Sequence, residues 1–335
     1  MKRALALLTF ALCGSLAEAA SPPPVVQGML DAARVLNYRG HVVQIEGTQA
    51  QTLYLLHRAG EDAGEDRVRS LQGAYGELHR TGSKCKVALT DARQAHDEAL
   101  VAAAFPSLLP QRLARLARFY DFTPSGNGRL ADREVDFTLA RPRDEFRFAY
   151  VVATDAATGL LMKASLVDQR GQILRQVFFV NLELLPSLSE TEWNKPNDGA
   201  APPLVWTEHS LDLSAVQAVI PWQVGELPPG FGISSYVRRR MPGGEHEIEQ
   251  IILSDGLTTI SVFIEPQSAT DPGLLGMQRV AAILAYGTSV AGKHITVLGA
   301  APFATLQQIA NALTAASPAA NSLTVTAPSS SDKPQ

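Results

Sequence analysis

The stretch Glu145-Phe146-Arg147-Phe148-Ala149-Tyr150-Val151-Val152 decides the fold of the N-terminal half. Side chains two residues apart in a strand point to the same face, so the even-numbered residues from Phe146 to Val152 predict one aromatic face. Residues 155–159 are turn formers, and the next stretch, 160–166, again has apolar residues at every second position. Together these patterns predict an antiparallel meander with an aromatic face.

The chain on both sides of this meander extends the sheet. Residues 174–184 are apolar at odd and at even positions, which indicates a strand buried on both faces. Five further strands are expected between residues 40 and 89, and helices are expected over 25–36 and 111–120. We predict an α+β protein whose N-terminal part, 20–187, is an unclosed antiparallel β half-barrel with covering helices.

A second, smaller α+β domain is predicted over residues 213–316. Residues 188–212 are rich in proline and polar side chains and are interpreted as the linker. Beyond it, strands are expected over 247–253 and 258–264, joined by a tight turn at Asp255-Gly256. Two more strands and a final helix over 305–313 follow, and residues 317–335, rich in Ala, Ser, Pro and Thr, are expected to be a disordered tail.

The N-terminus has the order of a secretory signal peptide. Lys2 and Arg3 precede a short apolar run, and Ala17-Glu18-Ala19 matches the small residues that signal peptidase requires. The run is too short to cross about 30 Å of hydrocarbon. Residues 1–19 are therefore predicted to be a Sec-type signal peptide, cleaved on export to the periplasm.

Charge and cysteine content narrow the class of protein. Residues 1–19 hold two cations and one acid, so their removal changes the net charge from −4 to −5, which gives no support for nucleic-acid binding. Cys85 is then the single cysteine and is interpreted as a structural thiol. No nucleophile elbow, phosphate loop or dinucleotide fingerprint occurs, and the seven histidines are scattered. We expect a binding protein without catalytic residues, metal or cofactor.

Two groups of residues are candidates for binding. Phe146, Phe148, Tyr150, Met162 and Phe178 would line an apolar pocket open to acyl chains, although an ordinary hydrophobic core is the commoner role of such a stripe. Arg238-Arg239-Arg240, beside Tyr236, would meet the carboxylates of an acidic peptide. A solvated basic loop explains the three arginines equally well.

Several stretches, taken in order, resemble the RseB/MucB family of periplasmic sigma-E regulatory proteins. They lie between about residues 25 and 315 and include Leu36-Asn37-Tyr38-Arg39-Gly40, Phe119-Tyr120-Asp121-Phe122, Arg141-Pro142-Arg143-Asp144, Leu227-Pro228-Pro229-Gly230-Phe231 and Ser254-Asp255-Gly256-Leu257. The chain departs from the family at Ala300-Ala301, where a charged residue is expected, and at Phe148-Ala149-Tyr150, where Tyr-Gly-Tyr is expected.

The resemblance implies a function as well as a fold. The N-terminal domain would resemble lipoprotein carriers of the LolA type. The protein would bind the periplasmic domain of a membrane-bound anti-sigma factor and shield it from proteolysis in the envelope-stress pathway. Lipid, lipopolysaccharide or lipoprotein acyl chains would release it. A periplasmic lipoprotein or lipid carrier is the alternative, and a homo-oligomer is left open.

Overall fold

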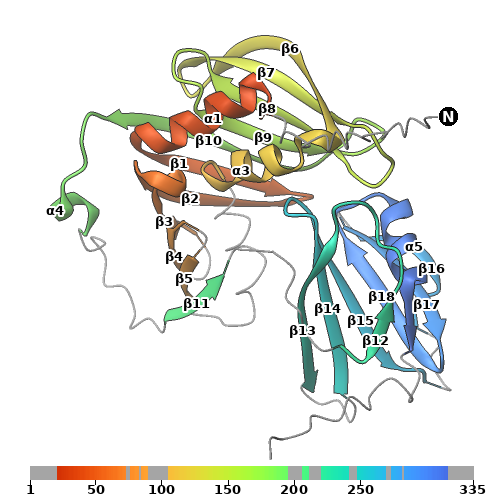
Figure 1. Ribbon diagram of the computed structural model, residues 1–335. Helices are drawn as coiled ribbons and strands as arrows, with labels where there is room; N and C mark the ends of the chain where they lie inside the picture. Colours follow the sequence, from red (N-terminus) through yellow and green to blue (C-terminus); the bar gives the residue numbers. More distant parts are fainter. Residues whose placement is uncertain are drawn as a thin grey trace, which may run out of the picture.

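The computed structural model describes residues 21–72, 76–82, 84–89, 105–194, 206–210, 220–240, 247–268, 273–280 and 283–315. These residues form a large sheet domain, at the top of Figure 1, and a smaller sheet domain, at its lower right. The predicted signal peptide and C-terminal tail lie outside the described residues. Within the described part of the chain, no helix has the length and apolar composition needed to cross a membrane.

Eleven antiparallel strands build the large sheet, and its two ends do not pair with each other. The order is β11-β5-β4-β3-β2-β1-β10-β9-β8-β7-β6, so the sheet is not closed into a barrel. This confirms the predicted unclosed architecture. The strands are β1 (Asn37–Glu46), β2 (Gln49–Arg58), β3 (Glu65–Ser70), β4 (Gly76–Thr81), β5 (Lys84–Leu89), β6 (Tyr120–Leu130), β7 (Arg133–Pro142), β8 (Ala149–Asp155), β9 (Leu161–Val167), β10 (Ile173–Leu185) and β11 (Trp206–Ser210).

Two helices, α1 (Pro24–Val35) and α3 (Leu108–Arg115), lie across one face of this sheet (Figure 1). We call these two helices the cover. The apolar stripe predicted for α3 is buried, with Leu113 fully inaccessible. The helix ends at Arg115 rather than at Tyr120, because a short 3-10 turn, η3 (Ala117–Phe119), follows and Tyr120 already pairs with Pro142 in the sheet.

The aromatic meander forms, but β8 begins at Ala149 and not at residue 145. The Asp144 carboxylate accepts a hydrogen bond from the backbone N–H of Phe146 at 3.1 Å, which closes a local turn. Such side-chain bonds to the backbone compete with a sheet ladder. The prediction of a strand from residue 145 was therefore wrong by four residues, and Phe146 and Phe148 precede the strand.

The segment assigned to the linker is partly ordered against the large domain. Its short helix α4 (Glu190–Trp193) begins with a capping box between Ser189 and Glu192. The guanidinium of Arg58 lies 4.4 Å from the centre of the Trp193 ring. Strand β11 then pairs with β5 and completes one end of the sheet. Part of the predicted linker thus belongs to the N-terminal domain.

The small domain has a six-stranded antiparallel sheet in the order β13-β14-β15-β18-β17-β16, with α5 (Phe303–Ala312) packed on β17 and β18. The predicted turn at Asp255-Gly256 joins β14 to β15, and Gly256 takes a φ of +97°, which glycine adopts without strain. Its strands are β13 (Gly232–Arg240), β14 (Glu247–Ser254), β15 (Thr259–Pro266), β16 (Gly276–Val280), β17 (Ile283–Val290) and β18 (Lys293–Gly299), with the pair β12 (Trp222–Val224) and β19 (Leu313–Ala315) beside them.

Candidate functional site

Three of the five residues predicted to line an apolar pocket lie together under the cover. Phe148, Tyr150 and Met162 are buried, and Met162 is fully inaccessible. They belong to one packed core with side chains of both cover helices, such as Met29 of α1 and Leu113 of α3. The face that these residues share is therefore packed with the protein's own side chains.

Phe146 and Phe178 lie elsewhere. Phe178 pairs with Lys163 across β10 and β9, and the ammonium group of Lys163 lies 5.5 Å from the centre of the Phe178 ring. Cross-strand partners share a face, so Phe178 is on the face opposite to its buried neighbour Phe179. Phe146 precedes β8, and its carbonyl accepts a hydrogen bond from Thr305 of the small domain at 2.7 Å.

The prediction that β10 is buried on both faces was also wrong. Leu174, Val177 and Phe179 are buried, whereas Ile173 is 54% exposed and Val180 is 47% exposed. The strand has irregular register with both neighbours, β9 and β1, and each irregularity adds one unpaired residue. One extra residue shifts which positions face inward, so the two apolar faces seen in the sequence do not correspond to two buried faces.

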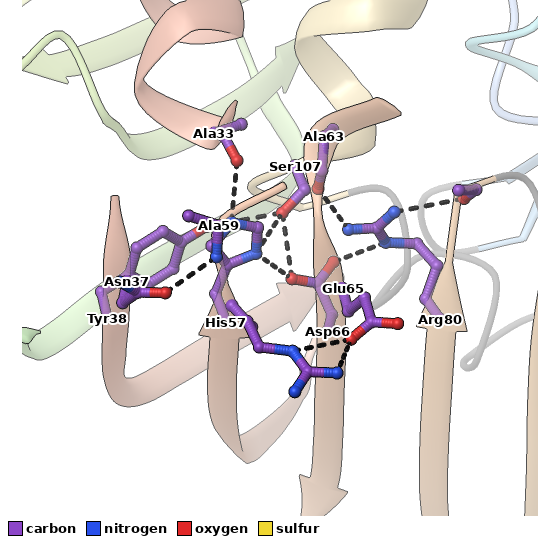
Figure 2. Close-up of polar contacts among 12 residues, drawn as sticks. Ala33, Asn37, Tyr38, His57, Ala59, Ala63, Glu65, Asp66, Arg80 and Ser107 are labelled. Atoms are coloured by element: carbon purple, nitrogen blue, oxygen red, sulfur yellow. Dashed lines mark hydrogen bonds and ion pairs between the residues drawn. The ribbon is translucent and has the colours of Figure 1, made fainter. Parts of the chain in front are cut away.

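A fully buried network of polar side chains joins β2, β3 and β4 to the end of α1 and to the residue before α3 (Figure 2). Its centre is the Asp66 carboxylate, which accepts hydrogen bonds from His57 Nδ1 at 2.6 Å, Ser107 Oγ at 3.1 Å and Arg80 Nε at 2.6 Å. Burial by itself raises the pKa of Asp66, but the charges of Arg80 and His57 and their hydrogen bonds outweigh it and lower the pKa below its ordinary value.

The His57 ring is held at both of its nitrogens. Its Nε2 lies 2.8 Å from the carbonyl oxygen of Ala33, which can only accept. Its Nδ1 faces the ionised Asp66, which also only accepts. Both ring nitrogens are thus engaged by buried oxygen atoms, and the ring stacks on the Tyr38 ring at 4.4 Å between centroids.

His57, Asp66 and Ser107 are the residue types of a hydrolase triad, but their geometry is that of a structural network. In such a triad the acid and the serine bond to opposite nitrogens of the histidine ring. Here Asp66 and Ser107 both face Nδ1, and the Ala33 carbonyl occupies Nε2. Both His57 nitrogens thus face partners other than a serine aligned for attack, and the side chains of His57 and Ser107 are fully buried.

The network attaches the cover to the sheet. His57 bonds to the last turn of α1 through Ala33, and Ser107 stands immediately before α3. Arg80 Nη2 donates to the carbonyl of Ala63, in the 3-10 turn η1 (Glu61–Ala63), at 2.7 Å. No sequence pattern signals this arrangement, because its members are separated by up to 50 residues and no local spacing relates them.

The predicted partner-binding arginines lie on β13, at the end of the small sheet. No strand pairs with the other edge of β13 among the described residues. Arg238 is exposed, and its Nε donates to the hydroxyl of Tyr236 at 2.7 Å. That hydroxyl in turn donates to Glu249 at 2.8 Å. The side chains of Arg239 and Arg240 are outside the described part, although their backbone belongs to the strand.

Cys85, interpreted as a structural thiol, is 3% exposed on β5. Burial raises the pKa of its thiol to about 11, so the nucleophilic thiolate is scarce at neutral pH. Among the described residues, no group of three or more His, Cys, Asp and Glu side chains is close enough to hold a metal ion.

Both domains match the models of known protein domains. The model of the MucB/RseB N-terminal domain matches residues 21–197, and that of the MucB/RseB C-terminal domain matches residues 216–314. The sigma factor AlgU regulatory protein MucB of Pseudomonas aeruginosa is 26% identical, over 88% of this chain and 90% of that protein. The sigma-E factor regulatory protein RseB of Escherichia coli K12 is 28% identical, over 92% and 95%. RseB of Haemophilus influenzae is 30% identical, over 62% of this chain and 63% of that protein.

Solved structures agree on the fold. MucB in complex with MucA(peri) superposes with a TM-score of 0.66 at 23% identity, covering 88% of this chain and 98% of that chain. A structure of MucB by itself gives a TM-score of 0.57 at 22% identity, covering 87% and 96%. The two-domain architecture described above is therefore shared with these proteins.

Proposed function

Because this chain belongs to the MucB/RseB family, whose members are regulatory binding proteins and not enzymes, we propose that it is a periplasmic negative regulator of an envelope-stress sigma factor. It binds the periplasmic part of a membrane-bound anti-sigma factor and shields it from proteolysis. The observation that carries this proposal is the match of both family domains, in order, along the chain. A relative, MucB, has been solved in complex with MucA(peri).

The cover supports the second part of the proposal, which is release by a lipid or lipopolysaccharide. The face under α1 and α3 is apolar and closed, and acyl chains bind such a surface once it opens. A ligand that binds only the open form shifts the protein toward that form by its differential affinity. If the anti-sigma factor binds the closed form more tightly, linkage requires that the ligand and the anti-sigma factor each lower the affinity of the protein for the other.

The edge of β13 supports a contact with the partner. An unpaired strand edge can add an extended peptide as a further strand, held by main-chain hydrogen bonds. Arg238-Arg239-Arg240 would select an acidic segment, because guanidinium groups pair well with carboxylates. We therefore assign the three arginines to the surface that receives the anti-sigma factor.

The test is binding of the mature full-length protein to labelled periplasmic segments of the anti-sigma factors encoded in the same genome. One segment is expected to bind with a Kd of about 1 µM or below. Lipopolysaccharide is expected to raise this Kd by about 5- to 150-fold. Replacing Arg238, Arg239 and Arg240 together by Gln is expected to raise the Kd by about tenfold.

The matched control is Arg39→Gln, which removes a cation from an exposed ion pair on the large sheet and should leave the Kd unchanged. Failure of every segment to bind, together with capture of acylated peptides, would contradict the regulator and favour the alternative, a lipoprotein or lipid carrier. The small domain argues against that alternative, since a carrier of the predicted type needs only the large domain.

A further inference from the structure

One arginine of the large domain is buried against the small domain. Arg147 precedes β8 and is 2% exposed. Its guanidinium pairs with Asp144 of its own domain, donates to the carbonyl of Pro229, and lies with Nε 3.2 Å from an Asp255 carboxylate oxygen. Pro229 and Asp255 both belong to the small domain. A cation that is nearly inaccessible to water thus has its partners divided between two domains.

Aromatic rings complete this environment. The Arg147 guanidinium lies 4.0 Å from the centre of the Phe119 ring and 5.8 Å from the centre of the Phe231 ring. The small domain also approaches closely at Gly230, where φ is +86° and an added Cβ would lie 2.9 Å from Arg147 Nη2. Only glycine fits this approach. The loop before β13 therefore packs directly against the guanidinium of Arg147.

Arg147 and Asp255 form an ion pair without a hydrogen bond between them. Nε of Arg147 and Oδ2 of Asp255 face each other at ion-pair distance but without hydrogen-bond geometry, and neither atom has a hydrogen-bond partner among the described residues. The Asp255 carboxylate also accepts from the backbone N–H groups of Leu257 and Thr258 at its other oxygen. Oδ2 is thus left to face the cation of the other domain.

The cover is connected to the contacts that Arg147 makes with the small domain. Phe119, which stacks on Arg147, lies in η3 directly after α3, and its carbonyl accepts from the backbone N–H of Arg143 at 2.9 Å. The preceding helix α3 is held in the core by Leu109 and Leu113, and Leu116, which follows it, is buried as well. Displacing α3 would therefore carry Phe119 away from Arg147. By contrast, α1 bonds to the large domain, through the carbonyls of Ala33 to His57 and of Arg34 to Gly60.

We propose that Arg147 is an interdomain latch controlled by α3: its contacts with Asp255, Pro229 and Phe231 fix the orientation of the small domain, and displacement of α3 and η3 releases it. The latch rests on the proposed function for its regulatory meaning, since it would transmit opening of the cover to the arrangement of the two domains. The latch itself is a property of the free protein and is measured without any partner.

The experiment measures the distance between spin labels in the two domains. Labels are placed on exposed residues by Ala157→Cys in the large domain and Gln307→Cys on α5, in a Cys85→Ala background. The starting protein is expected to give one narrow distance distribution. The isosteric change Asp255→Asn removes the charge that faces Arg147 with little change in shape, and it is expected to broaden the distribution at least about twofold. Arg39→Met, at an exposed ion pair, is the control and should leave it narrow.

The link to α3 is tested by two core truncations in the cover. Leu113→Ala loosens α3, and Met29→Ala loosens α1, while both residues are almost fully buried. Leu113→Ala is expected to broaden the distribution and Met29→Ala is expected to leave it narrow, with circular dichroism confirming that both variants are folded. A narrow distribution in Asp255→Asn would overturn the latch, and equal behaviour of the two truncations would overturn its control by α3.

Discussion

Arg80→Met is expected to lower the free energy of unfolding of the large domain by about 3–5 kcal/mol. Arg80 is fully inaccessible, and its ion pair with Asp66 at 2.6 Å is 0% and 1% exposed on the two sides. Removing one member of a buried pair leaves the other charge without compensation in a medium of low polarity. Methionine keeps most of the volume, so the change reports mainly on charge. Urea denaturation followed by circular dichroism measures it.

The matched control is Arg39→Met. Its ion pair with Glu183, at 2.7 Å, has side-chain exposures of 43% and 57%. Water screens such a pair, and its loss is expected to cost about 1 kcal/mol or less. Similar losses in the two variants would show that the buried network does not stabilise the fold.

The network also predicts how stability depends on pH. The pKa of Asp66 is lowered in the folded protein, so its contribution is present above the pKa of the unfolded chain and is lost as the pH falls through the folded value. Glu77 adds to this effect: burial raises its pKa, but hydrogen bonds from His79 and Arg67 prevail and lower it to about 2. Stability should therefore decline on acidification, and Arg80→Met should show a smaller decline.

Phe179→Ala is expected to destabilise the protein by about 3–5 kcal/mol. The Phe179 side chain is fully inaccessible and lies between the rings of Tyr38 and Phe105, at 6.1 and 5.5 Å between centroids. Truncation removes its apolar contacts and leaves a cavity under the cover. Chemical denaturation of the purified variant measures the loss.

Phe178→Ala is the control for this change, because it removes the same side chain from the adjacent position of the same strand. Phe178 contacts Lys163 on the opposite face and is only partly buried. Its loss is expected to cost about 1.5 kcal/mol or less, a typical effect outside the core. If Phe178→Ala were the more damaging, the assignment of the two faces of β10 would be wrong.

Local patterns in the sequence predicted most of the strands and the apolar stripe of α3. The turn at Asp255-Gly256 was confirmed: it joins two paired strands, and Gly256 takes a positive φ that glycine adopts without strain. The aromatic meander was confirmed in its strand pairing, with β8 next to β9 and β9 next to β10. These features depend on residues near one another in the chain, which periodicity and turn chemistry describe.

Long-range contacts account for what the sequence did not predict. β8 starts late because Asp144 and Arg147 are engaged in local and interdomain bonds. Irregular register in β10 decides which phenylalanine faces inward. The pairing of β11 with β5, across more than 100 residues, has no local signature. The same holds for the network around Asp66, which consists of ordinary polar residues until the fold brings them together.

Protection of the anti-sigma factor from proteolysis tests the central claim most directly. The periplasmic segment that binds in the assay above is exposed to a protease that cleaves it, with and without a stoichiometric amount of the mature protein, and the intact segment is followed over time. We predict that the protein preserves the segment and that added lipopolysaccharide restores cleavage. Cleavage at the same rate with and without the protein, under conditions in which the segment is bound, would contradict its assignment as a shielding regulator.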